Sequence, residues 1–166
     1  MMRSRVVVTT GVLLVASSAG WWLGHQRTEA EPQVRVVEAI DGDTIVVAFG
    51  DGRTDTIRLL GIDTPETHHP TKGVQCYGPE AAAFTARRLT GRIVRLEGDV
   101  EARDQYDRRL AYVIVDGERF NDVLLRRGYA RLLVIAPNGA HAREELTAEL
   151  AAQRAGRGLW SECGND

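Results

Sequence analysis

The sequence is poor in cysteine and has no excess of basic residues. Cys76 and Cys163 are its only cysteines, and no CxxC or HxxxH spacing accompanies them, which argues against metal ligation of the usual zinc type. Lysine and arginine together number 21, against 23 aspartates and glutamates, whereas most non-specific nucleic-acid binders show the opposite balance. Internal repeats and low-complexity tracts are also missing, in agreement with a single domain.

The one long stretch without charge lies at the N-terminus. It runs from Val6 to Gly24 and follows Arg3 and Arg5, which is the layout of a secretory signal peptide. Its length is also close to the roughly 20 residues that span a bilayer, so an uncleaved anchor is an alternative; a buried helix of the domain is a weaker one. We therefore expect residues 1–32 to be a signal peptide or membrane anchor with its linker. The domain would then be exported, either secreted or held by residues 6–24 on the outer side of the cytoplasmic membrane.

Residues 33–166 have the size of one domain with one core, which we expect to be a monomer. If the chain before the apolar run is removed with Arg3 and Arg5, 19 of the 21 basic residues remain against 23 acidic ones, a net charge near −4 for the mature protein. A metal site made of carboxylates would absorb some of this charge, and the arginines could still be clustered locally.

Both cysteines come after the export signal. In an oxidising compartment an even pair favours a disulfide, here between Cys76 and Cys163. Closing a loop of this length stabilises a protein by roughly 4 kcal/mol in the chain-entropy model. Metal ligation and two unpaired thiols are the alternatives.

Five short segments have the alternation and β-branched composition of strands. Asp51-Gly52 between the second and third is a strong hairpin signal. The segments are Val34–Ile40, Thr44–Phe49, Thr54–Ile62, Ile93–Glu97 and Leu110–Val115.

Three helices are predicted between and after these strands. The first covers residues 79–89, with Pro79 in its first turn. Asn121 is predicted to cap the second, which ends at Gly128, and the third covers residues 141–155. We expect its apolar face to carry Ala142, Leu146 and Leu150. Five short strands with a helix after the third favour a five-stranded OB-type barrel with three helices over a sandwich.

Side chains suited to phosphodiester chemistry gather around the third strand. The segment Ile57–Glu66, I-R-L-L-G-I-D-T-P-E, contains one cation, two carboxylates and a hydroxyl. D-G-D-T at 41–44 precedes it, and Arg108 comes at the start of a later strand. Oxygen ligands for a hard cation, a carboxylate for water and guanidinium groups for phosphate are what metal-assisted cleavage requires.

Each of these segments also has a purely structural interpretation. Asp41-Gly42-Asp43 could be a plain turn, and residues 63–66 could form a helix N-cap. Arg58 could be a surface cation, and Arg108 could pair with Asp104 or Asp107. An EF-hand is excluded, because the required glycine and glutamate are missing after Asp41. The three histidines of the predicted domain have no metal-type spacing and fit loop positions; they are His68, His69 and His141.

Five segments, in order and spacing, resemble the staphylococcal nuclease (thermonuclease) family. They are D-G-D-T at 41–44, R-L-L-G-I-D-T-P-E at 58–66, H-P-T-K-G-V-Q-C-Y-G-P-E-A at 69–81, Y-D-R-R-L-A-Y at 106–112 and L-W-S-E at 159–162. The resemblance covers nearly all of the exported part. It implies an OB-type barrel with three helices and a calcium-dependent nuclease that cleaves DNA and RNA to leave 3′-phosphates.

The resemblance also implies roles for individual residues. Asp43 and Asp63 are expected to bind Ca²⁺ through their side chains, and Thr64 through its carbonyl. Glu66 is expected to act as the base. The phosphate would be contacted by Arg58 and Arg108, and the substrate by Lys72 and Tyr106.

Two departures from the family pattern affect nucleotide binding. Residues 132–136 read L-L-V-I-A where members of the family place tyrosines near the base, and Gln105 stands where lysine is common. Weaker nucleotide binding is expected, because a stacked aromatic contributes roughly 1–3 kcal/mol per base. The alternative function is a catalytically weak OB-type nucleic-acid-binding protein of the envelope. The metal-and-base residues favour the enzyme, since a binding module has no use for them.

Overall fold

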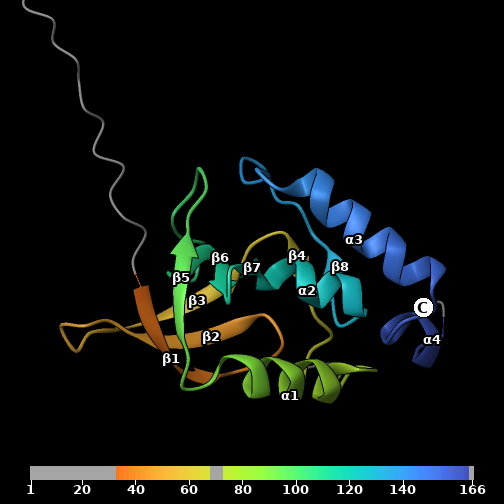
Figure 1. The fold of residues 1–166 in the computed structure, drawn as a ribbon, viewed down its shortest axis with the longest axis horizontal. Helices are drawn as coiled ribbons and strands as arrows, with labels where there is room; N and C mark the ends of the chain where they lie inside the picture. Colours follow the sequence, from red (N-terminus) through yellow and green to blue (C-terminus); the bar gives the residue numbers. More distant parts are fainter. Residues whose placement is uncertain (1–32, 68–72, 165–166) are drawn as a thin grey trace, which may run out of the picture.

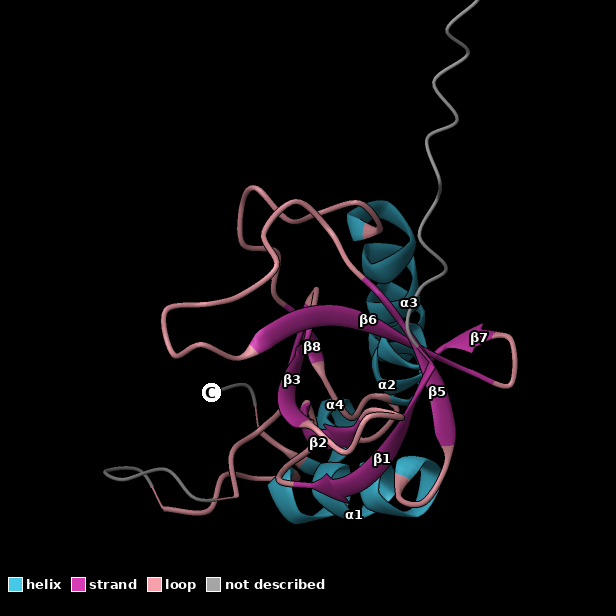
Figure 2. Cartoon of the chain, turned by 90° about the vertical axis from the view of Figure 1, so that its left-hand side faces the viewer, coloured by secondary structure: helices cyan, strands magenta, loops and turns pink. Residues whose placement is uncertain are grey.

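The computed structural model describes residues 33–67 and 73–164. The predicted signal or anchor, and also His68, His69 and Lys72, lie outside the described residues. Five strands form the barrel: β1 (Gln33–Ala39), β2 (Thr44–Ala48), β3 (Thr54–Leu59), β5 (Ile93–Glu97) and β6 (Arg109–Val115). They follow one another in the order β3-β2-β1-β5-β6, and a parallel pairing of β3 with β6 closes the ring (Figure 2). The predicted five-stranded OB-type barrel is confirmed.

The strands alternate as their sequences suggest. Val34, Val36, Ile45 and Val47 are almost completely buried inside the barrel, while their neighbours face outward or toward the helices. The β2–β3 connection is a tight hairpin, in which Phe49 donates its N–H to the Arg53 carbonyl at 2.8 Å. Gly52 in this turn has a φ of 87°, a conformation that glycine adopts at little cost. The Asp-Gly hairpin signal is confirmed.

The predicted third strand is interrupted. It splits into β3 and the two-residue β4 (Ile62–Asp63), because Gly61, with a φ of 73°, turns the chain between them. β4 pairs with β8 (Arg131–Leu132), and β7 (Glu118–Arg119) extends the barrel sheet beyond β6. The turn carries the residues after β3 away from the barrel wall.

Helices cover the barrel from two sides (Figure 1). α1 (Gly78–Leu89) lies along β1, and α2 (Phe120–Arg127) packs between the barrel and α3 (Ala142–Arg154). A fourth helix of four residues, α4 (Leu159–Glu162), adds to the three that the sequence predicts. α3 and α4 lie at the opposite end of the molecule from the β2–β3 hairpin. Within the two described ranges, no helix combines the length and the apolar character needed to cross a membrane.

The prediction that Asn121 is the N-cap of α2 is wrong. Arg119 occupies the cap position, and Asn121 is completely buried in the first turn. Its amide donates to the Leu60 carbonyl at 2.7 Å, and its Oδ1 accepts the Val113 N–H at 3.0 Å. The side chain therefore joins β6 to the β3–β4 turn instead of capping its own helix.

The buried face of α3 also differs from the expected one. It carries Glu145, Ala148, Glu149 and Ala152, whereas Leu146 is 43% exposed. Glu149 accepts the Leu132 N–H at 2.9 Å, so this carboxylate satisfies a backbone group of β8. Apolar spacing alone indicated the wrong face, because the buried face of α3 includes two glutamates that such a pattern assigns to solvent.

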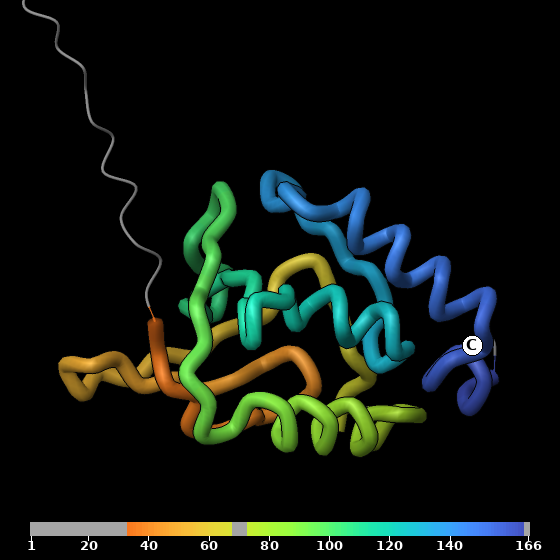
Figure 3. Tube along the Cα trace, viewed as in Figure 1, coloured from red at the N-terminus to blue at the C-terminus, as the bar shows by residue number. Residues whose placement is uncertain are grey.

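The cysteine prediction is confirmed, because Cys76 and Cys163 form a disulfide. After α3 the chain turns back through α4 toward the start of α1 (Figure 3). The bond therefore ties the end of the described chain to the segment just before α1.

Candidate active site

A tight turn before β2 places the first carboxylate of the candidate site. Asp41 Oδ1 accepts the N–H groups of Asp43 at 2.9 Å and Thr44 at 2.7 Å. Thr85 of α1 donates its hydroxyl to the Gly42 carbonyl at 2.7 Å. A Cβ at position 42 would lie only 2.7 Å from the Thr64 side chain, so glycine is needed here. The D-G-D-T segment forms the turn of the purely structural interpretation, and this turn also positions Asp43 next to Thr64.

The carboxylate of Asp43 is nearly completely buried, with 5% of the residue exposed. Its Oδ2 accepts the Thr64 N–H at 2.8 Å and the Thr64 hydroxyl at 3.0 Å. Its Oδ1 accepts the Thr44 hydroxyl at 3.1 Å. These bonds fix both oxygens, so the carboxylate has a defined position before any ligand arrives.

Arg58 joins this carboxylate to a second one. It lies on β3 where that strand pairs with Thr44 of β2 on one side and with Leu110 of β6 on the other. Its Nε is 3.1 Å from Asp43 Oδ1, and its Nη2 donates to Asp63 Oδ1 at 3.0 Å. Nη1 donates to the carbonyls of Leu59 and Ile62, so the side chain also braces the β3–β4 turn. With only 14% of its side chain exposed, Arg58 is not the surface cation of the structural interpretation.

The environment of Asp43 favours binding of a cation. Burial raises its pKa to about 6; Arg58 and the Thr64 bonds act in the lowering direction, and Asp41 in the raising direction. A buried carboxylate next to a second, half-exposed carboxylate is stabilised in its ionised form by a bound cation.

The oxygen donors at this position fit calcium. Asp43, Asp63 and the backbone carbonyl of Thr64 are hard ligands of the kind that calcium prefers, and calcium takes six to eight oxygens. No group of three or more His, Cys, Asp or Glu side chains that could hold a metal occurs in the described part of the chain. Water and substrate oxygens would therefore complete the coordination.

Glu66 comes two residues after Thr64 and is held through its backbone. Its N–H donates to Gln75 Oε1 at 2.8 Å, and its carbonyl accepts the Gln75 N–H at 2.9 Å. The start of α1 approaches so closely that a Cβ at Gly78 would lie 2.7 Å from the Glu66 carbonyl oxygen. The alternative interpretation of residues 63–66 as a helix N-cap is wrong, because no helix begins at these residues.

The second arginine lies in a turn before β6. Arg108 Nε donates to Asp104 Oδ2 at 2.7 Å, and its guanidinium lies 5.4 Å from the Tyr106 ring centroid. Burial alone would raise the pKa of Asp104, but the hydrogen bonds from Arg108 and from the Tyr106 amide outweigh it and lower this pKa. Asp104 therefore stays ionised and orients the Arg108 side chain.

A cavity of about 380 Å³ lies beside the two arginines. Arg58, Arg108 and Tyr106 line it together with Gln105. Leu133 and Ile135, from the segment without aromatic residues, supply part of its apolar wall. The site therefore combines guanidinium groups with a largely apolar surface next to them.

The structure thus brings most of the predicted site residues together. Arg58 bonds to Asp43 and Asp63, and Thr64 donates to Asp43. Arg58 also lines one cavity with Arg108 and Tyr106. Sequence reasoning missed Gln75 and Thr85, whose hydrogen bonds hold the backbone of the site. Pro79 indicated the start of the first helix but gave no sign of these contacts.

Comparison with known proteins identifies related chains. A family model described as staphylococcal nuclease homologue matches residues 56–162. A thermonuclease of Staphylococcus hyicus is 43% identical over 166 residues, covering 93% of this chain and 98% of the relative. A thermonuclease of Staphylococcus intermedius is 42% identical, covering 75% and 74%. Endonuclease YncB of Bacillus subtilis (strain 168) is 39% identical, covering 79% of this chain and 63% of the relative.

Proposed function

Because this chain belongs to the staphylococcal nuclease family, we propose that it is an exported calcium-dependent nuclease of DNA and RNA that leaves 3′-phosphate ends. Relatives named thermonuclease and endonuclease support an enzyme that hydrolyses nucleic acids. The observation that carries the proposal is the position of Arg58, which bonds to two carboxylates and also lines the cavity beside Arg108.

Asp43, Asp63 and the Thr64 carbonyl would hold the calcium ion. When bound, calcium supplies positive charge that polarises the phosphate and offsets the negative charge added by nucleophilic attack. Arg58 and Thr64 keep the Asp43 carboxylate ionised and oriented, since both donate to it. Arg58 also limits the repulsion between the two carboxylates.

Glu66 would accept a proton from the attacking water. The new bond forms between the water oxygen and phosphorus, and the bond from phosphorus to the 5′ oxygen breaks. The 5′ oxygen keeps the electron pair and takes up a proton from solvent to become a hydroxyl, which leaves the phosphate on the 3′ side. Arg108 can direct its terminal N–H groups at the phosphate oxygens, because Asp104 engages its Nε. Paired N–H groups stabilise the more highly charged transition state more than the ground state.

The cavity wall would receive the nucleotide base. Leu133 and Ile135 offer apolar contact, and Tyr106, which is 71% exposed, offers an aromatic face. Weaker binding of the nucleotide than with several stacked aromatics is expected. Lys72 remains a proposed substrate contact on the basis of its position in the motif.

Export is proposed from the N-terminal sequence and from the disulfide. Disulfides persist in oxidising compartments, and the Cys76–Cys163 bond fits such a location. Residues 6–24 would act as a cleaved signal or as an anchor on the outer side of the cytoplasmic membrane. The exported domain would act as a monomer.

Incubation of the purified domain with plasmid DNA and with RNA tests the proposal. We expect cleavage with calcium, loss of cleavage with a chelator, and products with 3′-phosphates. Glu66→Gln should lower kcat by at least about 100-fold, the range of lost acid–base catalysis. Binding of both nucleic acids without calcium-dependent cleavage would support the alternative, a catalytically weak OB-type binding protein.

A further inference from the structure

Gln75 is hydrogen-bonded to the backbone of Glu66. The two residues exchange two hydrogen bonds: Gln75 Oε1 accepts the Glu66 N–H at 2.8 Å, and the Gln75 N–H donates to the Glu66 carbonyl at 2.9 Å. The side-chain amide of Gln75 therefore acts directly on the backbone of the proposed base. Gly78, at the start of α1, leaves no room for this backbone to shift toward the helix.

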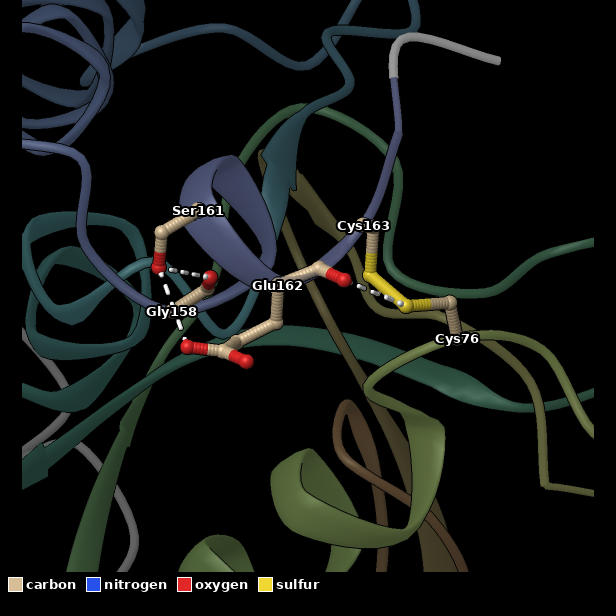
Figure 4. Close-up of a disulfide and its surroundings, with 5 residues drawn as sticks. All are labelled: Cys76, Gly158, Ser161, Glu162 and Cys163. Carbon is tan, nitrogen blue, oxygen red and sulfur yellow. Dashed lines mark hydrogen bonds between the residues drawn. A yellow bond between two sulfur atoms is a disulfide. The ribbon is translucent and has the colours of Figure 1, made fainter.

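The residue after Gln75 is bonded covalently to the other end of the domain. Cys76 forms the disulfide with Cys163, which follows α4 directly (Figure 4). Cys76 Sγ also lies 3.8 Å from the Glu162 carbonyl oxygen. α4 itself is firmly attached, because Leu159 is almost completely buried and donates its N–H to the Gly128 carbonyl at 2.9 Å.

We propose that Gln75 is a positioning residue for Glu66 and that the Cys76–Cys163 disulfide holds Gln75 in the place where it does this. The inference rests on the proposed function, in which Glu66 is the base. A base must lie within hydrogen-bond reach of its water, and a misplacement of about 1 Å lowers the rate by as much as roughly 100-fold.

The calcium ligands are held by a separate set of contacts. Asp43 is fixed by Thr64 and Arg58, and Asp63 is fixed by Arg58. Loss of the Gln75 contacts should therefore lower kcat while calcium affinity and KM stay almost unchanged. A general loss of structure would change all three.

Replacement of the acceptor tests the role of Gln75. Gln75→Met keeps the length of the side chain but removes the acceptor, and we expect kcat to fall by about 10- to 100-fold, within the range for a misplaced catalytic group. Gln75→Glu keeps an acceptor oxygen and should restore most of the lost kcat. Exchange of the Glu66 amide hydrogen, followed by NMR, should be faster in Gln75→Met than in either Gln75→Glu or the unaltered protein.

The disulfide is tested with the double variant Cys76→Ser/Cys163→Ser, assayed well below its unfolding midpoint. Its kcat should fall, and adding Gln75→Met should lower kcat by less than the product of the two separate effects, because both act on Glu66. Val123→Ala, which removes buried methyl groups from α2, controls for lost stability and should keep kcat.

The possible results separate this inference from the proposed function. Unchanged kcat in Gln75→Met would overturn the inference while calcium-dependent cleavage by the unaltered enzyme still stands. Equal losses in Gln75→Met and Gln75→Glu would also overturn it, since the acceptor would then not be the cause. Absence of cleavage by the unaltered enzyme would overturn the proposed function, and this inference with it.

Discussion

Each nitrogen of the Arg58 guanidinium has a protein partner. Nε faces Asp43, Nη2 donates to Asp63, and Nη1 donates to two carbonyls of the β3–β4 turn. Among the described residues, Arg108 has an acceptor only on its Nε. The two arginines are therefore suited to different tasks: Arg58 organises the carboxylates, and Arg108 is better placed to supply paired donors to a phosphate.

Lysine substitutions should separate these two tasks. Arg58→Lys removes the simultaneous contact with Asp43 and Asp63, so we expect weaker calcium binding together with lower turnover. Arg108→Lys removes the paired donors and the Nε contact with Asp104, neither of which involves the proposed calcium ligands. We therefore expect kcat/KM to fall by at least about 10-fold with unchanged calcium affinity. Arg109→Lys, at the first residue of β6, is the matched control. Equal calcium affinities in the two site variants, measured by calorimetry, would contradict the division.

Asp43 should couple calcium to stability. A ligand that binds the folded state adds about 2.7 kcal/mol to its stability at 100 times Kd, so calcium should raise the unfolding midpoint of the unaltered protein. Asp43→Asn should abolish this rise and the calcium-dependent cleavage, while Glu38→Gln, which removes an exposed carboxylate of β1, should keep both. Thermal unfolding with calcium and with a chelator measures the effect. A full calcium-induced shift in Asp43→Asn would remove Asp43 from the ligand set.

The residue types of the site were predictable because they occur in short segments of fixed spacing. Arg58, Asp63 and Thr64 lie on β3, on β4 and directly after β4, within one short segment, so local sequence places them together. Gln75 was not predictable, since its role depends on a contact with Glu66 across nine positions of the chain. The unequal roles of the two arginines likewise depend on partners that only the folded chain brings near.

At the level of secondary-structure elements, α3 shows how a residue on another element can decide which face of a helix is buried. Glu145 is completely buried, and neither carboxylate oxygen has a hydrogen-bond partner among the described residues. Its carboxylate occupies the space above Gly61, where a Cβ would overlap it. A sequence-based amphipathic pattern assigns glutamate to the solvent face, and it misses the space that a glycine on another element provides.

This carboxyl group should make stability depend on pH. Burial raises the pKa of Glu145 to about 7, and the acidic neighbours add to this while Arg119 opposes it. Between about pH 4.5 and 7, Glu145 therefore keeps its proton in the folded state and loses it in the unfolded state. The stability that the protonated Glu145 contributes is fully present below about pH 4.5 and is lost as the pH rises through 7. The ionisable groups around it, on β7, α2, α3, β6 and the loop after β5, are Arg119, Asp122, Glu144, Tyr112 and Asp99.

Glu145→Gln should remove this dependence. The free energy of unfolding of this variant relative to the unaltered protein should increase by about 2.5 kcal/mol between pH 5 and pH 8, because folding raises the pKa of Glu145 from about 4.5 to about 7. Glu144→Gln, an exposed neighbour, should show no such trend. Urea unfolding at several pH values provides the measurement. If the difference in free energy of unfolding between Glu145→Gln and the unaltered protein were constant across this pH range, Glu145 would not titrate as stated.

Periodicity and turn residues predicted the barrel strands because both are local. The alternation of buried residues in β1 and β2 follows the sequence directly, and Gly52 marks the hairpin. The two-residue pairing of β4 with β8 and the short helix α4 were not predicted. Such short elements exist through their tertiary contacts, and their own sequences contain no periodic pattern.

On the scale of the whole molecule, the candidate site lies in a chain whose basic residues do not outnumber its acidic ones. Its net charge is −2, yet Arg58 and Arg108 lie beside one cavity. In the proposed function, phosphate binding would therefore depend on placement of these guanidiniums more than on a general positive field. The residues that position the site come from segments far apart in sequence. The Cys76–Cys163 disulfide, which joins two such segments, is therefore expected to help keep them in place.

The Cys76–Cys163 bond should contribute strongly to the stability of this closed chain. The two cysteines are 87 positions apart, and a link across such a loop lowers the entropy of the unfolded chain by an amount equivalent to roughly 4 kcal/mol. Cys76→Ser/Cys163→Ser should therefore lower the unfolding midpoint in denaturant and expose α4 to proteolysis. Calcium binding should change little, because Arg58 and Thr64 hold Asp43 independently. Mass spectrometry of the protein, alkylated without reductant, should find no free thiol, and two alkylated cysteines would show that the bond does not form.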